Sequence, residues 1–265
     1  MEDRYSRTKL LIGQNALNRL KGCRVAVFGV GGVGGYVVEA LARSGIGALD
    51  LIDSDAVALS NLNRQIIALE STVGQLKVDI FEKRIHEIDP SVKVRKYPMF
   101  YMPEKRGEIP FPEFDYIVDA IDTVAAKLDI IQAASDLGIP VISAMGCGNR
   151  LDPGKLLVTD INKTSGDPLA KVIRKELRLR GIKKLKVVYS SELPTKPGSA
   201  DSELPTKPGT TDSELPTKPG SAEDEPEPPK RKRSTPGSMT FVPASAGLMI
   251  ASEVVRALIS TEVQP

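Results

Sequence analysis

The stretch VAVFGVGGVGGYVVEALARSGIGALDLIDSDAVALSNLNRQ, residues 25–65, decides the fold. A short apolar, β-branched run ends at a glycine-rich turn, and a segment with helical spacing of its apolar residues follows. Gly29, Gly31 and Gly34 give this turn the pattern GxGxxG. Between a strand and a helix, the first glycine permits the tight turn, the second lets phosphate approach the backbone, and the third brings helix and strand together. The stretch therefore predicts a nucleotide-binding strand–turn–helix unit.

Strands and helices keep alternating on the C-terminal side of this stretch. Apolar runs predict strands at 23–30, 48–55, 92–99, 114–122 and 139–146. Helical spacing predicts helices at 35–46, 72–89 and 125–138. Such alternation is typical of an α/β fold of Rossmann type, with a doubly wound, mainly parallel sheet and right-handed crossovers.

Charged residues near the glycine turn distinguish two kinds of nucleotide. The phosphates of NAD need mainly backbone N–H groups, whereas ATP carries about four negative charges and its reaction needs cations nearby. Asp53 lies at the end of the second strand, where an acid binds ribose hydroxyls, and we expect Asp55 to belong to the same cofactor-binding site. Arg64 and Lys77 supply positive charge, and Asp122 ends a predicted strand where it could hold Mg²⁺. Each charge alone could be a solvated surface group, but together they favour ATP.

Five motifs in order resemble the ubiquitin-activating-like adenylating enzymes of the ThiF/MoeB/HesA type. They are RYSRTKLLIG (4–13), GVGGVGGYVVEALARSGIG (29–47), LIDSDAVALSNLNRQ (51–65), VGQLKVD (73–79) and VDAIDT (118–123). The resemblance implies an ATP·Mg²⁺ site and a homodimer in which Arg7 reaches into the partner subunit's site as an arginine finger. It assigns the phosphates to Gly31 and Gly32, within a cofactor-binding turn that also includes Gly29 and Gly34. It assigns the ribose to Asp53, the border of the triphosphate to Asn61, Asn63, Arg64 and Gln65, a phosphate contact to Lys77 and the metal to Asp122.

The second half of the chain indicates which carboxylate is activated. The sulfur-carrier branch often holds zinc with two CxxC pairs, but this chain has only Cys23 and Cys147 and no CxxC. Residues 146–192 and 241–259 resemble instead the tRNA threonylcarbamoyladenosine dehydratases. This implies ATP-dependent activation of the carboxylate of N6-threonylcarbamoyladenosine in tRNA, as acyl-adenylate or acyl-phosphate, and then cyclisation with formal loss of water. Two alternatives stay open: adenylation of the C-terminal glycine of a ubiquitin-like sulfur-carrier protein, and a non-catalytic, nucleotide-gated tRNA-binding module. A sulfur-transfer protein also stays open as a partner.

A run of basic residues supports a nucleic-acid partner. Only Glu176 opposes eight cations: Lys171, Arg174, Lys175, Arg178, Arg180, Lys183, Lys184 and Lys186. Clustered basic charge drives sequence-independent binding to phosphate. We expect Val172, Ile173, Leu177 and Leu179 to anchor the helix, with its basic side chains facing the tRNA backbone. The alternative is a solvated helix face.

The composition changes abruptly at residue 191. An 11-residue unit recurs three times, as SELPTKPGSAD, SELPTKPGTTD and SELPTKPGSAE. Such a tract cannot bury enough apolar surface to offset the entropy lost on ordering. The sequence therefore predicts an ATP-binding domain at 1–190, a disordered insertion at 191–237 and a C-terminal helix at 238–265 that packs back on the domain.

Compartment and reactivity follow from the cysteines and the apolar segments. Two cysteines without a disulfide framework favour a reducing, cytoplasmic location. The start of the chain lacks the apolar core of a signal peptide, and Glu253 and Arg256 interrupt the longest apolar run, which therefore reads as a buried helix rather than a membrane span. Cys147 could be a thioester nucleophile, but a small residue at a strand end is the favoured interpretation, because intramolecular attack needs no enzyme thiol.

Overall fold

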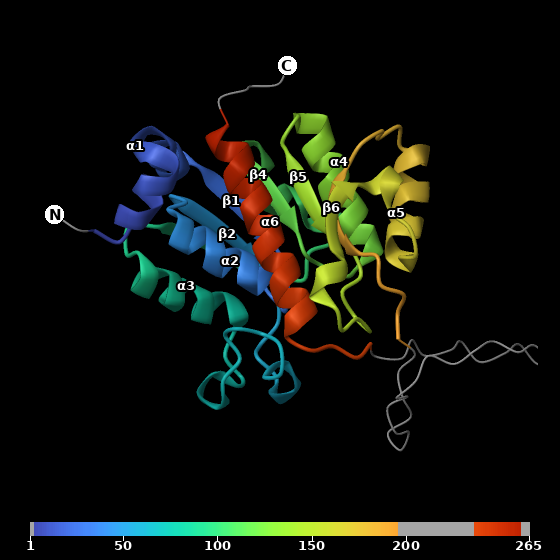
Figure 1. The fold of residues 1–265 in the computed structure, drawn as a ribbon, viewed down its shortest axis with the longest axis horizontal. Helices are drawn as coiled ribbons and strands as arrows, with labels where there is room; N and C mark the ends of the chain where they lie inside the picture. The colour runs from blue at the N-terminus through green and yellow to red at the C-terminus, as the bar shows by residue number, and fades with distance from the viewer. Residues whose placement is uncertain (1–2, 196–235, 261–265) are drawn as a thin grey trace, which may run out of the picture.

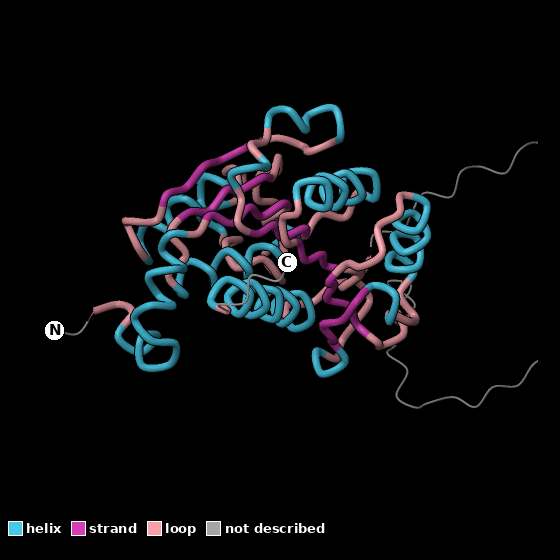
Figure 2. Tube along the Cα trace, turned by 90° about the horizontal axis from the view of Figure 1, so that it is seen from above, coloured by secondary structure: helices cyan, strands magenta, loops and turns pink. Residues whose placement is uncertain are grey.

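One seven-stranded sheet lies between two layers of helices in the computed structural model of the protein (Figures 1 and 2). The structure describes residues 3–195 and 236–260. The strands, in their order across the sheet, are β3 (Lys93–Tyr97), β2 (Ala48–Ile52), β1 (Arg24–Phe28), β4 (Tyr116–Asp119), β5 (Val141–Ala144), β7 (Lys186–Ser190) and β6 (Leu156–Asp160). All neighbours are parallel except β6 and β7. The predicted doubly wound, mainly parallel α/β fold is confirmed, and the antiparallel edge pair was not predicted.

The helices cover both faces of the sheet because alternate residues of its strands point to opposite sides. The helices are α1 (Ser6–Gly22), α2 (Gly34–Ser44), α3 (Lys77–Ile88), α4 (Val124–Leu137), α5 (Pro168–Leu179) and α6 (Phe241–Ile259). In β1, Val25 and Val27 join the hydrophobic core beneath α2, α3 and α6. Ala26 and Phe28 join the core beneath α4. One strand thus ties both helical layers to the glycine turn that follows it.

The last helix, α6, packs tightly on α2 (Figure 1). A Cβ atom at Gly247 would collide with the Val33 carbonyl oxygen, so the two helices approach backbone to backbone. Ala246, Ile250 and Val254 are buried in the core. By length and composition alone α6 could cross a membrane, but here it forms part of the α/β core.

Both ends of the predicted insertion are hydrogen bonded to the loop after β5. The amide of Ser191 donates to the Lys155 carbonyl oxygen, and the amide of Thr195 donates to the Asn149 carbonyl oxygen. The amide of Gly237 donates to the Asn149 side chain. Residues 196–235, which hold most of the repeats, lie outside the described residues. The division at 1–190, 191–237 and 238–265 stays a prediction.

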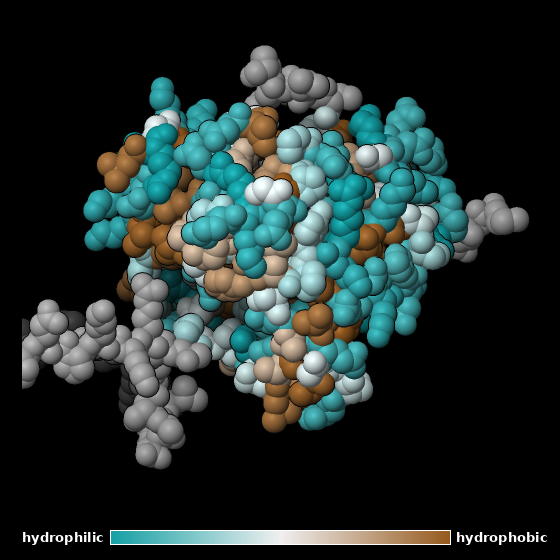
Figure 3. Space-filling view, turned by 180° about the vertical axis from the view of Figure 1, so that it is seen from behind, coloured by the Kyte–Doolittle hydropathy of each residue, from teal (hydrophilic) through white to brown (hydrophobic). Residues whose placement is uncertain are grey.

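The segment between β2 and α3 projects below the sheet (Figure 1). Leu59, Leu69 and Val73 of this segment are exposed. The view from behind shows hydrophobic side chains on the lower projection, and others at the upper left and centre of the face (Figure 3). The projection carries the residues from Asn61 to Gln65 beside the glycine turn.

Candidate functional site

The glycine turn between β1 and α2 has the close backbone packing that its sequence predicts. Gly29 has a φ of +82°, and a Cβ atom there would lie 2.8 Å from the Ala120 carbonyl oxygen. A Cβ atom at Gly34 would collide with the Gly29 carbonyl oxygen. At Gly31, only the Gln65 amide nitrogen among the described residues comes within 4 Å of such an atom, at 3.6 Å. The turn therefore leaves open backbone at Gly31, beside the positive N-terminal end of α2.

Two acids and a buried lysine lie beside this turn. Asp53, which follows β2, accepts hydrogen bonds from the amides of Val30 and Asp55, both at 2.8 Å. Lys77 is the first residue of α3, and its Nζ lies 2.7 Å from Asp55 and 4.0 Å from Asp53. The Lys77 side chain is 5% exposed, whereas that of Asp55 is 63% exposed. A phosphate could therefore replace the solvated Asp55 carboxylate as the partner of Lys77.

Arg64 and Gln65 lie against the glycine turn. The methylene groups of Arg64 approach the position of a Gly32 Cβ atom to 3.6 Å, and its guanidinium donates to the Ser60 carbonyl oxygen at 2.8 Å. Gln65 is buried, and among the described residues its Oε1 has no hydrogen-bond partner. These two side chains border the open backbone at Gly31 and Gly32, where the sequence analysis placed the triphosphate.

The two asparagines of the same segment bind protein groups. Asn61 accepts a hydrogen bond from the Ala58 amide at 3.1 Å. Asn63 donates to the Ser238 carbonyl oxygen at 2.8 Å, and its own carbonyl oxygen accepts from the Thr240 hydroxyl. Asn61 and Asn63 thus hold the shape of the segment, and Asn63 ties it to the approach to α6.

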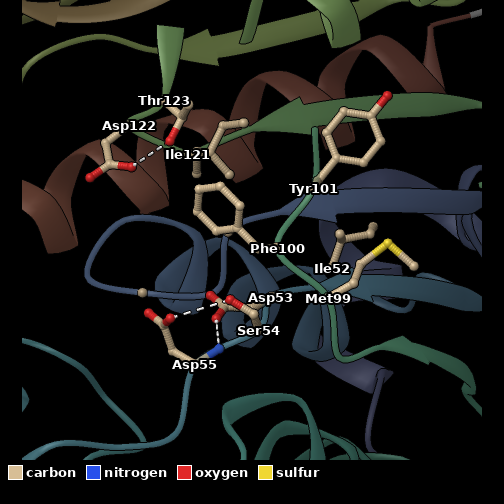
Figure 4. Close-up of a pocket in the computed structure, with 13 residues that line it drawn as sticks. Ile52, Asp53, Ser54, Asp55, Met99, Phe100, Tyr101, Ile121, Asp122 and Thr123 are labelled. Carbon is tan, nitrogen blue, oxygen red and sulfur yellow. Dashed lines mark hydrogen bonds between the residues drawn. The ribbon is translucent and has the colours of Figure 1, made fainter. Parts of the chain in front are cut away.

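The pocket in front of the turn has an acidic rim and an apolar wall (Figure 4). The side chains that line it include Ile52, Asp53, Asp55, Met99, Phe100, Tyr101, Ile121 and Asp122. Phe100 is 57% exposed and lies between the Asp122 side and the Asp53 side of the pocket (Figure 4). Such a wall suits a flat heterocycle such as adenine. Residues 99–101 were not predicted as site residues, although the apolar run MFYM at the end of a predicted strand was a usable signal.

Asp122 lies in the loop after β4 and is exposed. It follows Asp119, the last residue of that strand, by three positions, so the expectation that Asp122 ends the strand is wrong. The Thr123 hydroxyl lies 3.5 Å from its carboxylate. Within the described residues no three His, Cys, Asp or Glu side chains form a metal cluster. One free carboxylate beside a phosphate site nevertheless fits Mg²⁺, which usually takes one or two carboxylates together with substrate phosphates and water.

The comparisons with known proteins agree with this geometry. The sequence matches the ThiF family over residues 5–265. The chain belongs to the ThiF family. It is 40% identical, over 98% of its own length and 96% of the other protein, to the tRNA threonylcarbamoyladenosine dehydratase of Bacillus subtilis.

Two solved structures similar to this ThiF-family chain contain a bound nucleotide. The Escherichia coli tRNA N6-threonylcarbamoyladenosine dehydratase in complex with AMP has a TM-score of 0.80 and 31% identity, covering 97% of this chain and 94% of that chain. The complex of the same protein with ATP has a TM-score of 0.79 and 31% identity, covering 97% and 93%.

Arg7 of this ThiF-family chain lies far from the chain's own pocket. It is exposed near the start of α1, which bends at Gly13. The neighbouring Tyr5 donates a hydrogen bond to Asp89, the residue that caps the C-terminal end of α3, at 2.7 Å. Lys77 stands at the opposite end of α3, and a helix of 12 residues is about 18 Å long. Figure 1 shows α1 at the edge of the sheet opposite the projecting segment.

The basic run divides into two groups. Arg174 donates to the carbonyl oxygens of Ile161 and Thr164, Arg180 pairs with Glu176, and Lys186 pairs with Glu253 of α6. The other five cations are exposed, and their side chains form no ion pair or hydrogen bond within the described part of the chain: Lys171, Lys175, Arg178, Lys183 and Lys184. The free charge is therefore smaller than the sequence suggested.

Two of the expected anchors of α5 are wrong. Val172 and Leu179 are 45% and 74% exposed, while Ala170, Ile173 and Leu177 are buried. The buried residues recur at intervals of three and four, which places them on one face of the helix. Val172 and Leu179 each follow a buried residue by two positions, so they point away from that face.

Cys147 is a poor nucleophile in this ThiF-family chain. Burial raises the pKa of its thiol to about 12, and the Asp167 carboxylate adds to this effect. The side chain packs against the hydrophobic core beneath α6. Because the thiolate is the reactive form of cysteine, this environment favours the structural interpretation over a thioester intermediate.

Proposed function

We infer that this chain is an ATP-dependent tRNA threonylcarbamoyladenosine dehydratase. It activates the carboxylate of N6-threonylcarbamoyladenosine in tRNA and converts that nucleoside to the cyclic form. The observation that carries this conclusion is 40% identity to the Bacillus subtilis dehydratase along almost the whole of both chains. The Escherichia coli protein of the same name has been solved with ATP and with AMP, and this chain shares its fold.

The nucleotide would lie along the pocket of Figure 4. Asp53 keeps lone pairs for ribose hydroxyls after accepting its two amide hydrogen bonds. Residues 99–101 form the wall for adenine, and the phosphates extend over Gly31 and Gly32. There Arg64, Gln65 and Lys77 compensate the negative charge. A cation held in low dielectric acts more strongly on phosphate than one in water, and Lys77 is 4% exposed.

The chemistry is attack by a carboxylate oxygen on a phosphorus atom of ATP, which breaks a phosphoanhydride bond and releases pyrophosphate if an acyl-adenylate forms or ADP if an acyl-phosphate forms. Asp122 is the residue that would hold Mg²⁺, which when bound neutralises phosphate charge. Arg64 and Lys77 stabilise the charge that develops on the leaving group. The substrate's own carbamoyl group then attacks the activated carbonyl and gives up a proton to solvent. The ring closes, and the phosphorylated leaving group departs with the former carboxylate oxygen. Cys147 has no role in this sequence.

The working form would be a homodimer in which Arg7 completes the site of the partner subunit. Within its own subunit Arg7 lies about one helix length away from Lys77. Leu10 and Leu11, on the same first turns of α1, are 87% and 85% exposed, which is unusual for bulky apolar residues outside an interface. An arginine on such an arm can reach a second subunit but not its own pocket.

The tRNA backbone would lie along the exposed cations of α5 and the following loop. Lys171, Lys175 and Arg178 stand at intervals of four and three, so they share one face of the helix. This surface supplies sequence-independent affinity, while the modified base enters the pocket. A sulfur-transfer protein as an additional partner, and a cytoplasmic location for the chain with its two free cysteines, are extensions of the same proposal.

One assay tests the function and its competitors together. Purified protein is given ATP with tRNA bearing threonylcarbamoyladenosine, with the same tRNA lacking the modification, with a sulfur-carrier protein, or with nothing. We expect ATP consumption and formation of the cyclic nucleoside only with the modified tRNA. Consumption with the carrier protein would favour the sulfur-carrier alternative, and tRNA binding without consumption would favour a non-catalytic module.

A further inference from the structure

Arg150 is a buried cation, and within the described residues two of its nitrogens have no hydrogen-bond partner. The buried basic residues of the described part of the chain are Lys77, Lys127 and Arg150. Lys77 pairs with Asp55, and Lys127 pairs with Asp119 at 2.9 Å. Arg150 is 3% exposed, and neither its Nε nor its Nη1 has a hydrogen-bond partner among the described residues. Burying an unpaired charge costs free energy, and binding of an anion to Arg150 would offset that cost.

The position of Arg150 links it to the ATP pocket. It lies in the loop that follows the carboxyl end of β5, the edge of a parallel sheet where ligands bind. Asn149, the residue before it, is hydrogen bonded to Gly237, and Ser238 and Thr240 of the same segment are hydrogen bonded to Asn63. The loop of Arg150 is thus joined through residues 237–240 to the segment that carries Arg64 and Gln65 beside the glycine turn.

The residues on both sides of Arg150 are fixed in place. Asn149 has a φ of +58°. Its amide donates to the Gly237 carbonyl oxygen, and the Gly237 amide donates to its side-chain oxygen, both at 2.7 Å. On the other side, the amides of Leu151 and Asp152 both donate to the Glu192 carboxylate. A left-handed residue held by so many bonds is typical of functional loops, and it presents the guanidinium in a fixed place.

We propose that Arg150 binds the carboxylate of the threonylcarbamoyl group and directs it toward ATP. This inference rests on the proposed function. A guanidinium can hold a carboxylate with two parallel hydrogen bonds and remain protonated throughout. It would offset the repulsion between the incoming carboxylate and the triphosphate, and it forms no covalent bond in the reaction. The chain would then have one set of cations for the nucleotide and a separate cation for the acceptor.

A carboxylate fits this site better than a phosphate of the tRNA backbone. A phosphodiester is flanked by two riboses, and both would have to come close to a guanidinium that is only 3% exposed. The threonylcarbamoyl carboxylate instead ends a slender arm that projects from the base. The exposed cations of α5, such as Arg178, are the groups suited to backbone phosphates.

The test compares two tRNAs that differ only in the carboxylate. Affinities are measured in the presence of a non-hydrolysable ATP analogue for tRNA with threonylcarbamoyladenosine and for the same tRNA with unmodified adenosine. Arg150→Met should weaken binding of the modified tRNA by about 10-fold or more and leave the unmodified tRNA unchanged. Arg150→Lys, which keeps the charge but loses the paired hydrogen bonds, should show a smaller loss on the modified tRNA alone. The matched control Arg178→Met should weaken both tRNAs equally.

The other outcomes overturn the proposal. An equal loss on both tRNAs in Arg150→Met would assign Arg150 to backbone phosphate, and no loss on either would make it a structural residue. ATP affinity and melting temperature show whether each variant is folded, and if Arg150→Met fails to fold, Arg150→Lys decides. Wild-type protein that consumes no ATP with the modified tRNA would overturn the proposed function as well. This inference alone would be overturned if the wild type turns over and both Arg150→Lys and Arg150→Met still prefer modified over unmodified tRNA as strongly as the wild type does.

Discussion

The two sides of the pocket treat their charged groups differently. On the nucleotide side, Asp53, Asp55 and Lys77 already satisfy one another, so these three charged groups are paired before ATP arrives. On the acceptor side, Arg150 is buried without a partner within the described residues, and its loop is held by segments that lie far away in the sequence. The contrast suggests that the nucleotide side is a stable platform, whereas the acceptor side is completed by its substrate.

The largest expected effect concerns the nucleotide side. Lys77→Ala should lower turnover by about 100-fold or more, because loss of a preorganised cation at a phosphate typically costs a few kcal/mol. Arg64→Ala should have a similar effect. The measurement is ATP consumption with modified tRNA, and NAD should not compete. Lys83→Ala, an exposed lysine on the same helix, is the control. Wild-type turnover in both pocket variants would remove the ATP-site assignment.

Affinity for the tRNA backbone should depend on the exposed face of α5. Replacing Lys171, Lys175 and Arg178 together by alanine should weaken tRNA binding by roughly tenfold near physiological salt, whatever the base modification. The slope of log affinity against log salt should fall by about two to three, since each lost phosphate contact removes a little less than one. Replacing the exposed Lys21, Lys83 and Lys93 is the matched control. An unchanged slope in the α5 variant would show that its cations are merely solvated.

Subunit mixing tests whether the nucleotide side is completed from outside the chain. Arg7→Ala should lower activity while preserving ATP affinity better than Lys77→Ala does. Mixing these two variants should restore up to about a quarter of wild-type activity, because half of randomly exchanged dimers are mixed and each has one intact site. A mixture of Lys77→Ala and Arg64→Ala should restore nothing, since no site then holds both residues. If exchange occurs and the first mixture stays inactive, Arg7 does not act across an interface.

Local patterns in the sequence were enough for the core of the fold. The alternation of apolar runs predicted β1 to β5 and α2 to α4, since each of these elements carries its own periodicity. The pair β6–β7 was missed because its two strands are separated by α5 and meet at the sheet edge, a contact that no local pattern encodes. The anchors Val172 and Leu179 of α5 were wrong for a different reason: the intervals of three and four between Ala170, Ile173 and Leu177 are a local pattern, but it was not applied to this helix.

The sequence predicted the candidate nucleotide residues but not Arg150, for a related physical reason. The glycine turn, Asp53 and Lys77 belong to segments whose spacing is fixed by one strand–helix unit. Arg150 stands in the short sequence GCGNRLDP after a predicted strand, which was a usable signal for a ligand site. Its burial, however, depends on tertiary contacts of a loop tied to Glu192 and Gly237, and these are not local features.

Cys147, on the acceptor side of the pocket, should not act as a nucleophile in the reaction. Cys147→Ala should keep turnover within about twofold of wild type, because a thiol with a pKa raised to about 12 is almost entirely protonated near neutral pH. Alkylation by iodoacetamide should be slow at Cys147, and its rate should still be rising with pH well above neutrality. A large loss of turnover, or a substrate thioester trapped on Cys147, would contradict this prediction and restore the thioester alternative.

The smallest expected effect concerns the repeats. Deleting 196–235 and joining Thr195 to Pro236 with about four Gly and Ser residues should leave ATP affinity unchanged, because Thr195 and Gly237 both bond Asn149 and four residues can span roughly 13 Å. Closing a loop about tenfold shorter should stabilise the fold by about 2 kcal/mol at most, a rise of a few degrees in melting temperature. Deleting 192–237 instead also removes the Glu192 and Gly237 contacts with the loop of Arg150. That variant should keep ATP binding but lose its preference for modified tRNA. If the shorter deletion loses this preference as well, the repeats themselves take part in the acceptor side.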